Sequence, residues 1–338
     1  MPPLAHSAAR PGAPTPARTR RRPSGPARFL TTALLLTACG GGEADPAPAS
    51  SQAGSGSDSS ATATPQATSL LGEPLYARED TTGAVAEADR ALAADPENVD
   101  LLVEAGRVRR NFWQYREAQE LYTRALELAP EDWRPWRFRG HRHISRRDFE
   151  AAIADLERAR ELAPLNWDVA YHLGLAYFLD GRFEAAAEEY VRCLDLADDP
   201  AAEAADAEGF RSCARNADDA ESRVAMTEWA VRALNRAGRG AEAGALLAEV
   251  SPELPVEENL AYYHSLLMKK GEMAEAELLA DEAPYRLETV GYGIANHRLV
   301  EGDTAGARAL LERLVEDPWW PGFGRIAAEA ELVRLREG

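Results

Sequence analysis

The residues best able to do chemistry in this chain are few and widely spaced. None of the three cysteines stands in a Cys-x-x-Cys pair, which argues against a zinc or thioredoxin-like site. His141 and His143 form the only close histidine pair, but residues two apart on a helix point to different faces, and no third ligand follows. Gly-x-Ser-x-Gly, His-Glu-x-x-His and phosphate-loop motifs do not occur. We therefore expect no catalytic residues, no metal and no cofactor, and predict that the protein is not an enzyme.

The first cysteine, Cys39, follows a segment with the pattern of a targeting signal. Arginines between residues 18 and 28 precede a mostly apolar run of ten residues, 29–38. Ten helical residues rise only about 15 Å, roughly half the thickness of the hydrocarbon core, so this run is too short to span a membrane.

The residues Leu-Thr-Ala that lead into Cys39 resemble a bacterial lipobox. This resemblance implies that residues 1–38 are a lipoprotein signal peptide, that Cys39 carries palmitate-type acyl chains, and that the protein lies in the cell envelope. Gly40 stands where aspartate often marks retention in the inner membrane, which favours the outer membrane, facing the periplasm. The alternative is an ordinary signal peptide followed by an incidental cysteine.

Residues 39–70 are expected to form a flexible tether. Between residues 40 and 69 the chain holds Gly, Ser, Ala, Pro and Thr without any large apolar side chain, so it cannot bury enough surface to offset the entropy of ordering. The chain as a whole has a net charge of -18, although its first 38 residues carry only basic charges. An acidic body disfavours a nucleic-acid partner, since phosphate contacts need a cationic face.

Prolines recur every 34 residues, at Pro96, Pro130 and Pro164, each after an alanine-rich apolar run. In the three registers that these prolines define, glycine at position 8 is matched by alanine at position 20. This pattern resembles the tetratricopeptide-repeat family over residues 99–200. The resemblance implies an all-α fold, a superhelical solenoid of antiparallel helix-turn-helix repeats in which small residues let the two helices of a hairpin approach closely.

The repeats are expected to extend on both sides of this region. Residues 71–200 would hold a capping helix, with Thr82 as its N-cap, and three regular repeats. Residues 201–223 would form a partly helical, exposed insertion. Gly238, Gly271 and Gly302 align with Gly181 at the turn inside a hairpin, so residues 224–338 are predicted to hold three degenerate hairpins and a last capping helix near 325–336. The chain also looks like uncharacterised bacterial tetratricopeptide proteins that share its segments 139–145 and 291–293, a group that implies no known reaction.

In the tetratricopeptide family the concave face is lined by the first helix of each repeat. Four arginines on such a face would bind an acidic or C-terminal peptide. The alternative is that neighbouring acids, such as Glu104 and Asp168, pair with these arginines. The family's carboxylate clamp is not matched, so chaperone binding is not implied. The residues predicted for the partner-binding groove are Arg107, Arg110, Asn111, Arg134, Arg137, His141, Tyr171 and Phe178.

The sequence therefore predicts a lipid-anchored extracytoplasmic scaffold that binds a protein or peptide partner, with a role in envelope assembly. The alternative is an enzyme or small-ligand binder that uses the degenerate C-terminal half. Cys193 and Cys213 form a disulfide in one interpretation, whereas in the other Cys193 is a buried free thiol. Trp319 and Trp320 either cover the last helix or form an exposed contact patch.

Overall fold

The computed structural model describes residues 64–207, 209–280 and 286–337. Within these ranges it contains the helices α1–α16 and one antiparallel hairpin, in which β1 (Ala67–Thr68) pairs with β2 (Pro74–Leu75). None of the described helices is long and apolar enough to cross a membrane. The predicted signal peptide, the predicted lipidation site Cys39 and the tether up to residue 63 lie outside the described residues.

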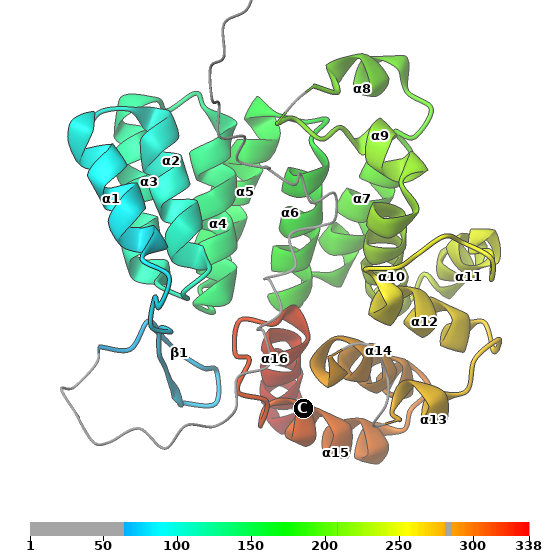
Figure 1. The fold of residues 1–338 in the computed structure, drawn as a ribbon. Helices are drawn as coiled ribbons and strands as arrows, with labels where there is room; N and C mark the ends of the chain where they lie inside the picture. Colours follow the sequence, from blue (N-terminus) through cyan, green and yellow to red (C-terminus); the bar gives the residue numbers. More distant parts are fainter. Residues whose placement is uncertain (1–63, 208, 281–285, 338) are drawn as a thin grey trace, which may run out of the picture. The chain divides into compact units, whose positions relative to one another are not determined.

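Three regular helical hairpins form the middle of the described chain, and their helices stand side by side in Figure 1. Each first helix packs against its own second helix, and each second helix packs against the next hairpin. This is the all-α repeat architecture predicted from the proline period. The helices are α2 (Val99–Arg110), α3 (Tyr115–Leu128), α4 (Trp133–Ser145), α5 (Phe149–Leu162), α6 (Trp167–Leu179) and α7 (Phe183–Leu194).

Each first helix begins at a side chain that recurs with the same period of 34. The N-cap residues are Asn98, Asp132 and Asn166, and each side chain accepts a hydrogen bond from a backbone N–H of the first turn. Each cap lies two residues after one of the periodic prolines, so the turn and the helix start are encoded together.

The glycine at position 8 is required by close packing inside each hairpin. A Cβ atom at Gly106 would lie 2.4 Å from a ring atom of Tyr122, and one at Gly174 would lie 2.6 Å from the ring of Tyr190. Real Cβ atoms do not tolerate such contacts, so a larger residue would force the two helices apart. The predicted close approach of the helices is thus present.

A capping helix, α1 (Ala84–Ala94), packs against α2 at the N-terminal end of the repeats. The prediction that Thr82 is its N-cap is wrong. Gly83 occupies that position with φ of 78°, and the Asp80 carboxylate accepts hydrogen bonds from the backbone N–H groups of Thr82 and Val85, both at 2.8 Å. Backbone with positive φ favours glycine, so the N-cap of α1 is Gly83, one residue after the predicted Thr82.

The insertion contains two short helices, α8 (Pro200–Ala205) and α9 (Cys213–Asp218), so it is partly helical as predicted. Its C-terminal end is bonded to the repeats and buried. Cys213 is disulfide-bonded to Cys193 of α7, with the two Cα atoms 5.3 Å apart, and its backbone N–H donates to Leu165 O. Both cysteines are fully buried, so the prediction of an exposed insertion is wrong for this end of it.

Three further hairpins and a last helix follow. Gly238, Gly271 and Gly302 have φ between 76° and 85°, like Gly181 at 86°, and each lies at the turn between two helices. This confirms the alignment of the four glycines, because left-handed backbone at a helix end favours glycine. The helices are α10 (Ala220–Arg236), α11 (Gly240–Glu249), α12 (Leu260–Lys269), α13 (Glu275–Leu278), α14 (Leu287–Val300), α15 (Thr304–Leu314) and α16 (Phe323–Glu337).

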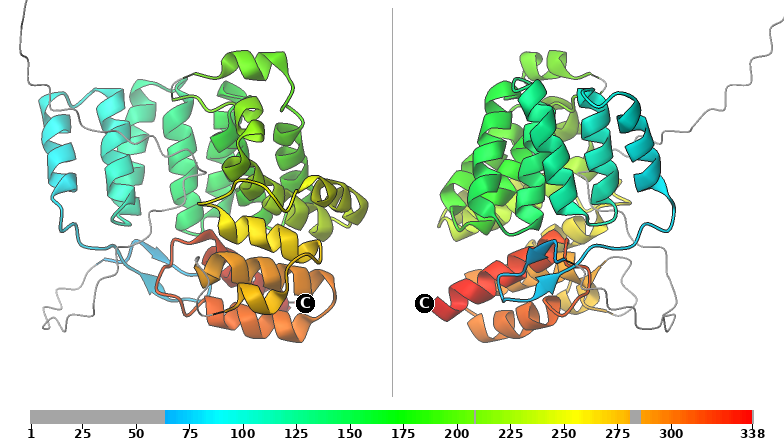
Figure 2. Two further views of the ribbon diagram at one scale, coloured as in Figure 1. Left: turned by 45° about the vertical axis from the view of Figure 1, so that its right-hand side comes forward. Right: turned by 90° about the vertical axis from the view of Figure 1, so that its left-hand side faces the viewer.

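The row of hairpins changes direction after α10. That helix packs on α7 as a regular first helix would, but α12 packs on α10 and α14, and α16 contacts α6. In Figures 1 and 2, α14, α15 and α16 lie at one end of α4 and α6. One hydrophobic core therefore joins the third repeat to the C-terminal helices, with buried members from Ile144 to Leu332.

The N-terminal hairpin packs against the loop before α16. Trp320 Nε1 donates to Tyr76 O at 2.9 Å, and the backbone N–H of Leu70 donates to Glu329 at 3.1 Å. Residues 66–70 belong to the folded body, so the predicted tether ends too late. Trp319 and Trp320 are 6% and 4% exposed, which rules out a contact patch there.

Candidate partner-binding surface

The inner face of the repeats, formed by α2, α4 and α6, carries all eight residues predicted for the partner-binding groove. The structure divides them into a buried group and an accessible group. The boundary follows the C-terminal helices, which cover α6 and part of α4.

Four of the eight are buried: Arg137, His141, Tyr171 and Phe178 are at most 4% exposed. Their assignment as partner contacts is corrected, because the chain itself occupies their part of the face. The ring of Phe323 lies 5.3 Å from that of His141 and 6.5 Å from that of Tyr171. Phe178 packs on Trp229 and Tyr292, with ring centroids 5.3 and 6.2 Å apart.

The buried histidines have the electrostatics of core residues. The rings of His141 and His172 are 4.3 Å apart, and His172 Nδ1 lies 2.6 Å from Asp168 O. Burial, together with Arg142, His172 and Arg137, lowers the pKa of His141 well below its ordinary value. A neutral imidazole beside arginines does not attract a cation, and the described residues contain no group of three or more His, Cys, Asp or Glu side chains placed to hold a metal.

Arg137 illustrates the alternative of internal pairing. Its guanidinium lies 3.6 Å from the carboxylate of Asp168 and 4.7 Å from the ring centroid of Phe138. Asp168 is one of the two acids that the sequence offered as partners for the groove arginines. At this position the arginine holds α4 against α6 and is not presented to solvent.

Arg107, Arg110, Asn111 and Arg134 remain at the other end of the face, on α2 and at the start of α4. Arg107 and Arg134 have 44% and 40% of their side-chain surface exposed. Arg107 lies over the ring of Phe138 at 5.6 Å, and Arg110 Nη2 donates to Asn111 Oδ1 at 3.2 Å. We call these four residues, together with Phe138, the α2–α4 surface.

Acids already contact the arginines of the α2–α4 surface. Glu104 lies 3.2 Å from Arg107, while Asp132 and Asp100 lie 2.6 and 2.8 Å from Arg134. The hydrogen bonds that Arg134 donates to Asp132 are the main cause that raises the pKa of Arg134. Exposed ion pairs of this kind are worth only about 0–1 kcal/mol, so a carboxylate with better geometry can replace Glu104 or Asp100.

The degenerate C-terminal half contains a buried polar cluster that sequence reasoning missed. Lys269 Nζ lies 2.9 Å from Ser265 Oγ and 2.5 Å from Glu228 Oε1, and Arg232 Nη2 donates to the same carboxylate at 2.8 Å. Burial lowers the pKa of Lys269 to about 8. A serine beside such a lysine could be activated as a nucleophile.

This cluster is closed to substrates. Ser265, Glu228 and Arg232 are at most 1% exposed, and the Lys269 side chain is 3% exposed. The groups hydrogen-bond to one another, although Glu228 Oε2 and Arg232 Nε have no hydrogen-bond partner among the described residues. A Cβ atom at Gly293 would lie 2.4 Å from Ser265 Oγ. The cluster thus explains the glycine at the end of segment 291–293, and its geometry is that of a buried ion pair within the core.

Segment 139–145 also has a packing role. Arg139 donates two hydrogen bonds to Asp155, at 2.7 and 2.8 Å, and Arg142 lies over the ring of Tyr115 at 4.6 Å. These side chains connect α4 to both neighbouring second helices. In the sequence, the only sign of this packing role was the high density of basic residues in the segment that forms α4.

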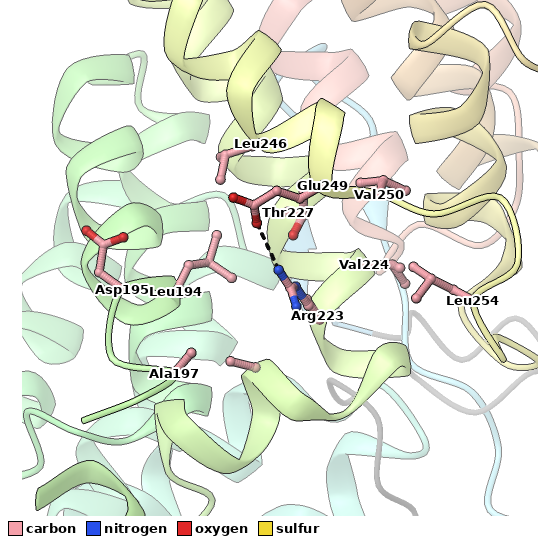
Figure 3. Close-up of a pocket in the computed structure, with 11 residues that line it drawn as sticks. Leu194, Asp195, Ala197, Arg223, Val224, Thr227, Leu246, Glu249, Val250 and Leu254 are labelled. Carbon is pink, nitrogen blue, oxygen red and sulfur yellow. Dashed lines mark hydrogen bonds and ion pairs between the residues drawn. The ribbon is translucent and has the colours of Figure 1, made fainter. Parts of the chain in front are cut away.

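One pocket opens between α7, α10 and α11, at the side of the molecule where the insertion ends (Figure 3). Its volume is about 130 Å³, well below the roughly 300–1,000 Å³ of typical small-molecule sites. The pocket is therefore too small for a cofactor. Its lining residues are Leu194, Asp195, Ala197, Ala217, Arg223, Val224, Thr227, Leu246, Glu249, Val250 and Leu254.

Comparison with known proteins agrees with the repeat assignment. A family model described as tetratricopeptide repeat matches residues 139–203. No curated protein matches the chain in sequence.

Several solved structures are similar to parts of the chain. MamA is 20% identical, with 56% of this chain and 88% of MamA covered and a TM-score of 0.38. YrrB, described as a tetratricopeptide protein with an unusual peptide-binding site, is 13% identical, with 74% and 100% covered and a TM-score of 0.41. A tetratricopeptide repeat protein from Parabacteroides merdae is 15% identical, with 72% and 91% covered and a TM-score of 0.46.

Proposed function

We propose that this tetratricopeptide-repeat chain is a scaffold, anchored to the outer membrane through lipidated Cys39, that binds an acidic segment of a protein partner on the α2–α4 surface. Binding, and not catalysis, is the proposed activity, because the polar cluster with the most catalytic character is sealed in the core. A role in envelope assembly follows from the proposed location.

The observation that carries this proposal is the set of accessible arginines beside Phe138. Arg107 and Arg134 lie on neighbouring repeats, and each contacts exposed or partly exposed acids. A partner carboxylate can take bidentate hydrogen bonds from these guanidinium groups, while an apolar side chain next to it packs on Phe138.

The test is capture of the partner from intact membranes by a photo-crosslinking residue placed at exposed Asn111. We expect Arg107→Glu together with Arg134→Glu to lower the crosslinked yield at least tenfold, since the acids would then repel the partner. Arg158→Glu is the control, because Arg158 is 35% exposed, has acidic neighbours and lies on a second helix. Equal loss of yield in the control, or unchanged yield in the double variant, contradicts the assignment of the site.

The anchor is tested separately through Cys39→Ser. We expect this variant to lose incorporation of labelled fatty acid and to leave the membrane fraction, while the helical content measured by circular dichroism stays the same. A variant that remains labelled and membrane-bound contradicts lipidation at Cys39.

A further inference from the structure

Helix α11 lacks a packing neighbour that the other long second helices have. The second helices α3, α5 and α7 each pack on the first helix of the next hairpin, but α11 packs chiefly on α10, because α12 turns away from it. Ala241, Gly244, Ala245 and Ala248 are consequently exposed on α11. The pocket of Figure 3 lies between α11 and the preceding helices α7 and α10.

The pocket wall is mixed, with aliphatic side chains beside Thr227 and the Arg223–Glu249 ion pair. Side chains from three elements meet there: Leu194 at the end of α7, Val224 on α10 and Leu246 on α11, with Val250 and Leu254 closing the far side (Figure 3). A cavity of about 150 Å³ with aliphatic walls accepts a benzene molecule, so 130 Å³ is room for one leucine or phenylalanine side chain.

The rim of the pocket is acidic. Asp195 and Glu249 line it and are exposed, and the exposed residues Asp198 and Glu253 stand next to the lining residues Ala197 and Leu254. Arg223 is the only basic residue among the lining side chains, and it is 3.0 Å from Glu249. Within the described part of the chain, no ion pair engages Asp195, Asp198 or Glu253, so the rim keeps a negative charge.

We propose that this pocket is a second docking site, which binds a lysine- or arginine-rich segment of a partner protein through one leucine- or phenylalanine-sized side chain. The apolar side chain enters the space between Leu194, Val224 and Leu246. The flanking cations of the segment lie against Asp195, Asp198 and Glu253. The site prefers the charge opposite to that preferred by the α2–α4 surface, so the two proposals can fail separately.

The test uses the full-length chain with Cys39→Ser and a fluorescent peptide of lysines around one central leucine. We expect binding by fluorescence anisotropy, with shifts of the Leu246, Val250 and Leu254 methyl signals in NMR spectra. Replacing the peptide's leucine by serine should weaken binding at least about tenfold, because one buried leucine is worth that much. A peptide with glutamate in place of lysine should not bind.

Two variants of the protein complete the test. Ala197→Trp fills the pocket and Asp195→Lys reverses charge at the rim, and each should weaken the lysine peptide several-fold. Ala241→Trp on the exposed side of α11 and Asp100→Lys on α2 are the matched controls and should bind normally. The proposal is overturned if the leucine and serine peptides bind equally, which indicates attraction to the acidic surface alone. It is also overturned if the lysine peptide does not bind at a concentration of about 1 mM.

Discussion

Glu288 is a carboxylic acid that the fold keeps out of water at the start of α14. It is 3% exposed, Thr289 Oγ1 donates to it at 2.9 Å, and Arg286 Nε lies 3.5 Å away. Burial raises the pKa of Glu288 to about 7, although Thr289 and Arg286 act in the opposite direction. At neutral pH the side chain is therefore close to half protonated inside the folded protein.

This raised pKa predicts a specific dependence of stability on pH. Between the ordinary pKa of 4.5 and the folded value near 7, the folded state holds a proton that the unfolded state releases. The contribution of Glu288 to the free energy of unfolding should therefore fall as pH rises through this window, by about 3 kcal/mol in all.

The measurement is urea unfolding of Glu288→Gln and the parent protein at several pH values between 4.5 and 8. Glutamine is neutral throughout, so the variant should lack this part of the slope. Glu301→Gln, an exposed change at the other end of α14, is the control and should keep the parent's slope. Parallel curves for parent and Glu288→Gln would show that Glu288 titrates normally.

At the scale of helices, the fit inside each hairpin depends on the glycine of the first helix. Gly174→Leu places a side chain where Tyr190 already lies, so we expect it to lower the free energy of unfolding by about 1–3 kcal/mol or more. Gly244→Leu is the same change on α11, where nothing lies within 4 Å of the added Cβ, and it should not destabilise the protein. Thermal or urea unfolding compares the two, and an equal effect would contradict close packing at Gly174.

The helices themselves could be predicted largely from the sequence, because their signals are local. The periodic prolines indicated the three regular hairpins. The glycines at 238, 271 and 302 indicated the later turns even though their spacing had drifted, since a left-handed residue at a helix end is required whatever the repeat length. The N-caps Asn98, Asp132 and Asn166 carried the same period and offered a signal that proline spacing alone did not use.

The occupancy of the groove could not be predicted in this way. His141 and Tyr171 stand at positions that face a groove in the repeat pattern, and the pattern does not show that Phe323 packs on them from the far end of the chain. That contact depends on the change of direction after α10, which is a property of long-range apolar packing. The repeat pattern therefore predicts which groove side chains are accessible only where the later helices do not fold back over the repeats, as on α2.

At the scale of the whole described chain, a buried ion pair joins the second regular repeat to the last helix. Arg147, at the turn after α4, donates two hydrogen bonds to Glu329 of α16, at 2.9 and 2.6 Å, and both side chains are at most 2% exposed. Removing Arg147 leaves the buried Glu329 carboxylate with only Arg325 and the Leu70 N–H as partners. We therefore expect Arg147→Met to destabilise the protein, by less than the about 3–5 kcal/mol that a fully uncompensated buried charge costs.

A double-mutant cycle measures how strongly the two side chains are coupled. Arg147→Met combined with Glu329→Gln should be less destabilised than the sum of the single variants, by about 1–3 kcal/mol. The exposed pair Arg158 and Glu161 is the control, and its coupling should be much weaker, because solvent screens it. If the double variant loses as much stability as the two single variants together, the two side chains are not coupled and the prediction is wrong.

The contact between the N-terminal hairpin and α16 also constrains the order in which this chain can fold. Leu70 and its acceptor Glu329 are 259 residues apart, and Trp320 and its acceptor Tyr76 are 244 residues apart. A chain that emerges from its N-terminus presents the hairpin long before its docking partners have been synthesised. The regular repeats can form from neighbouring contacts as they emerge, whereas the hairpin must wait, undocked, until the last helix is free. The final step of folding is therefore the joining of the first and last described elements, and it is the step most open to interference by chaperones or proteases.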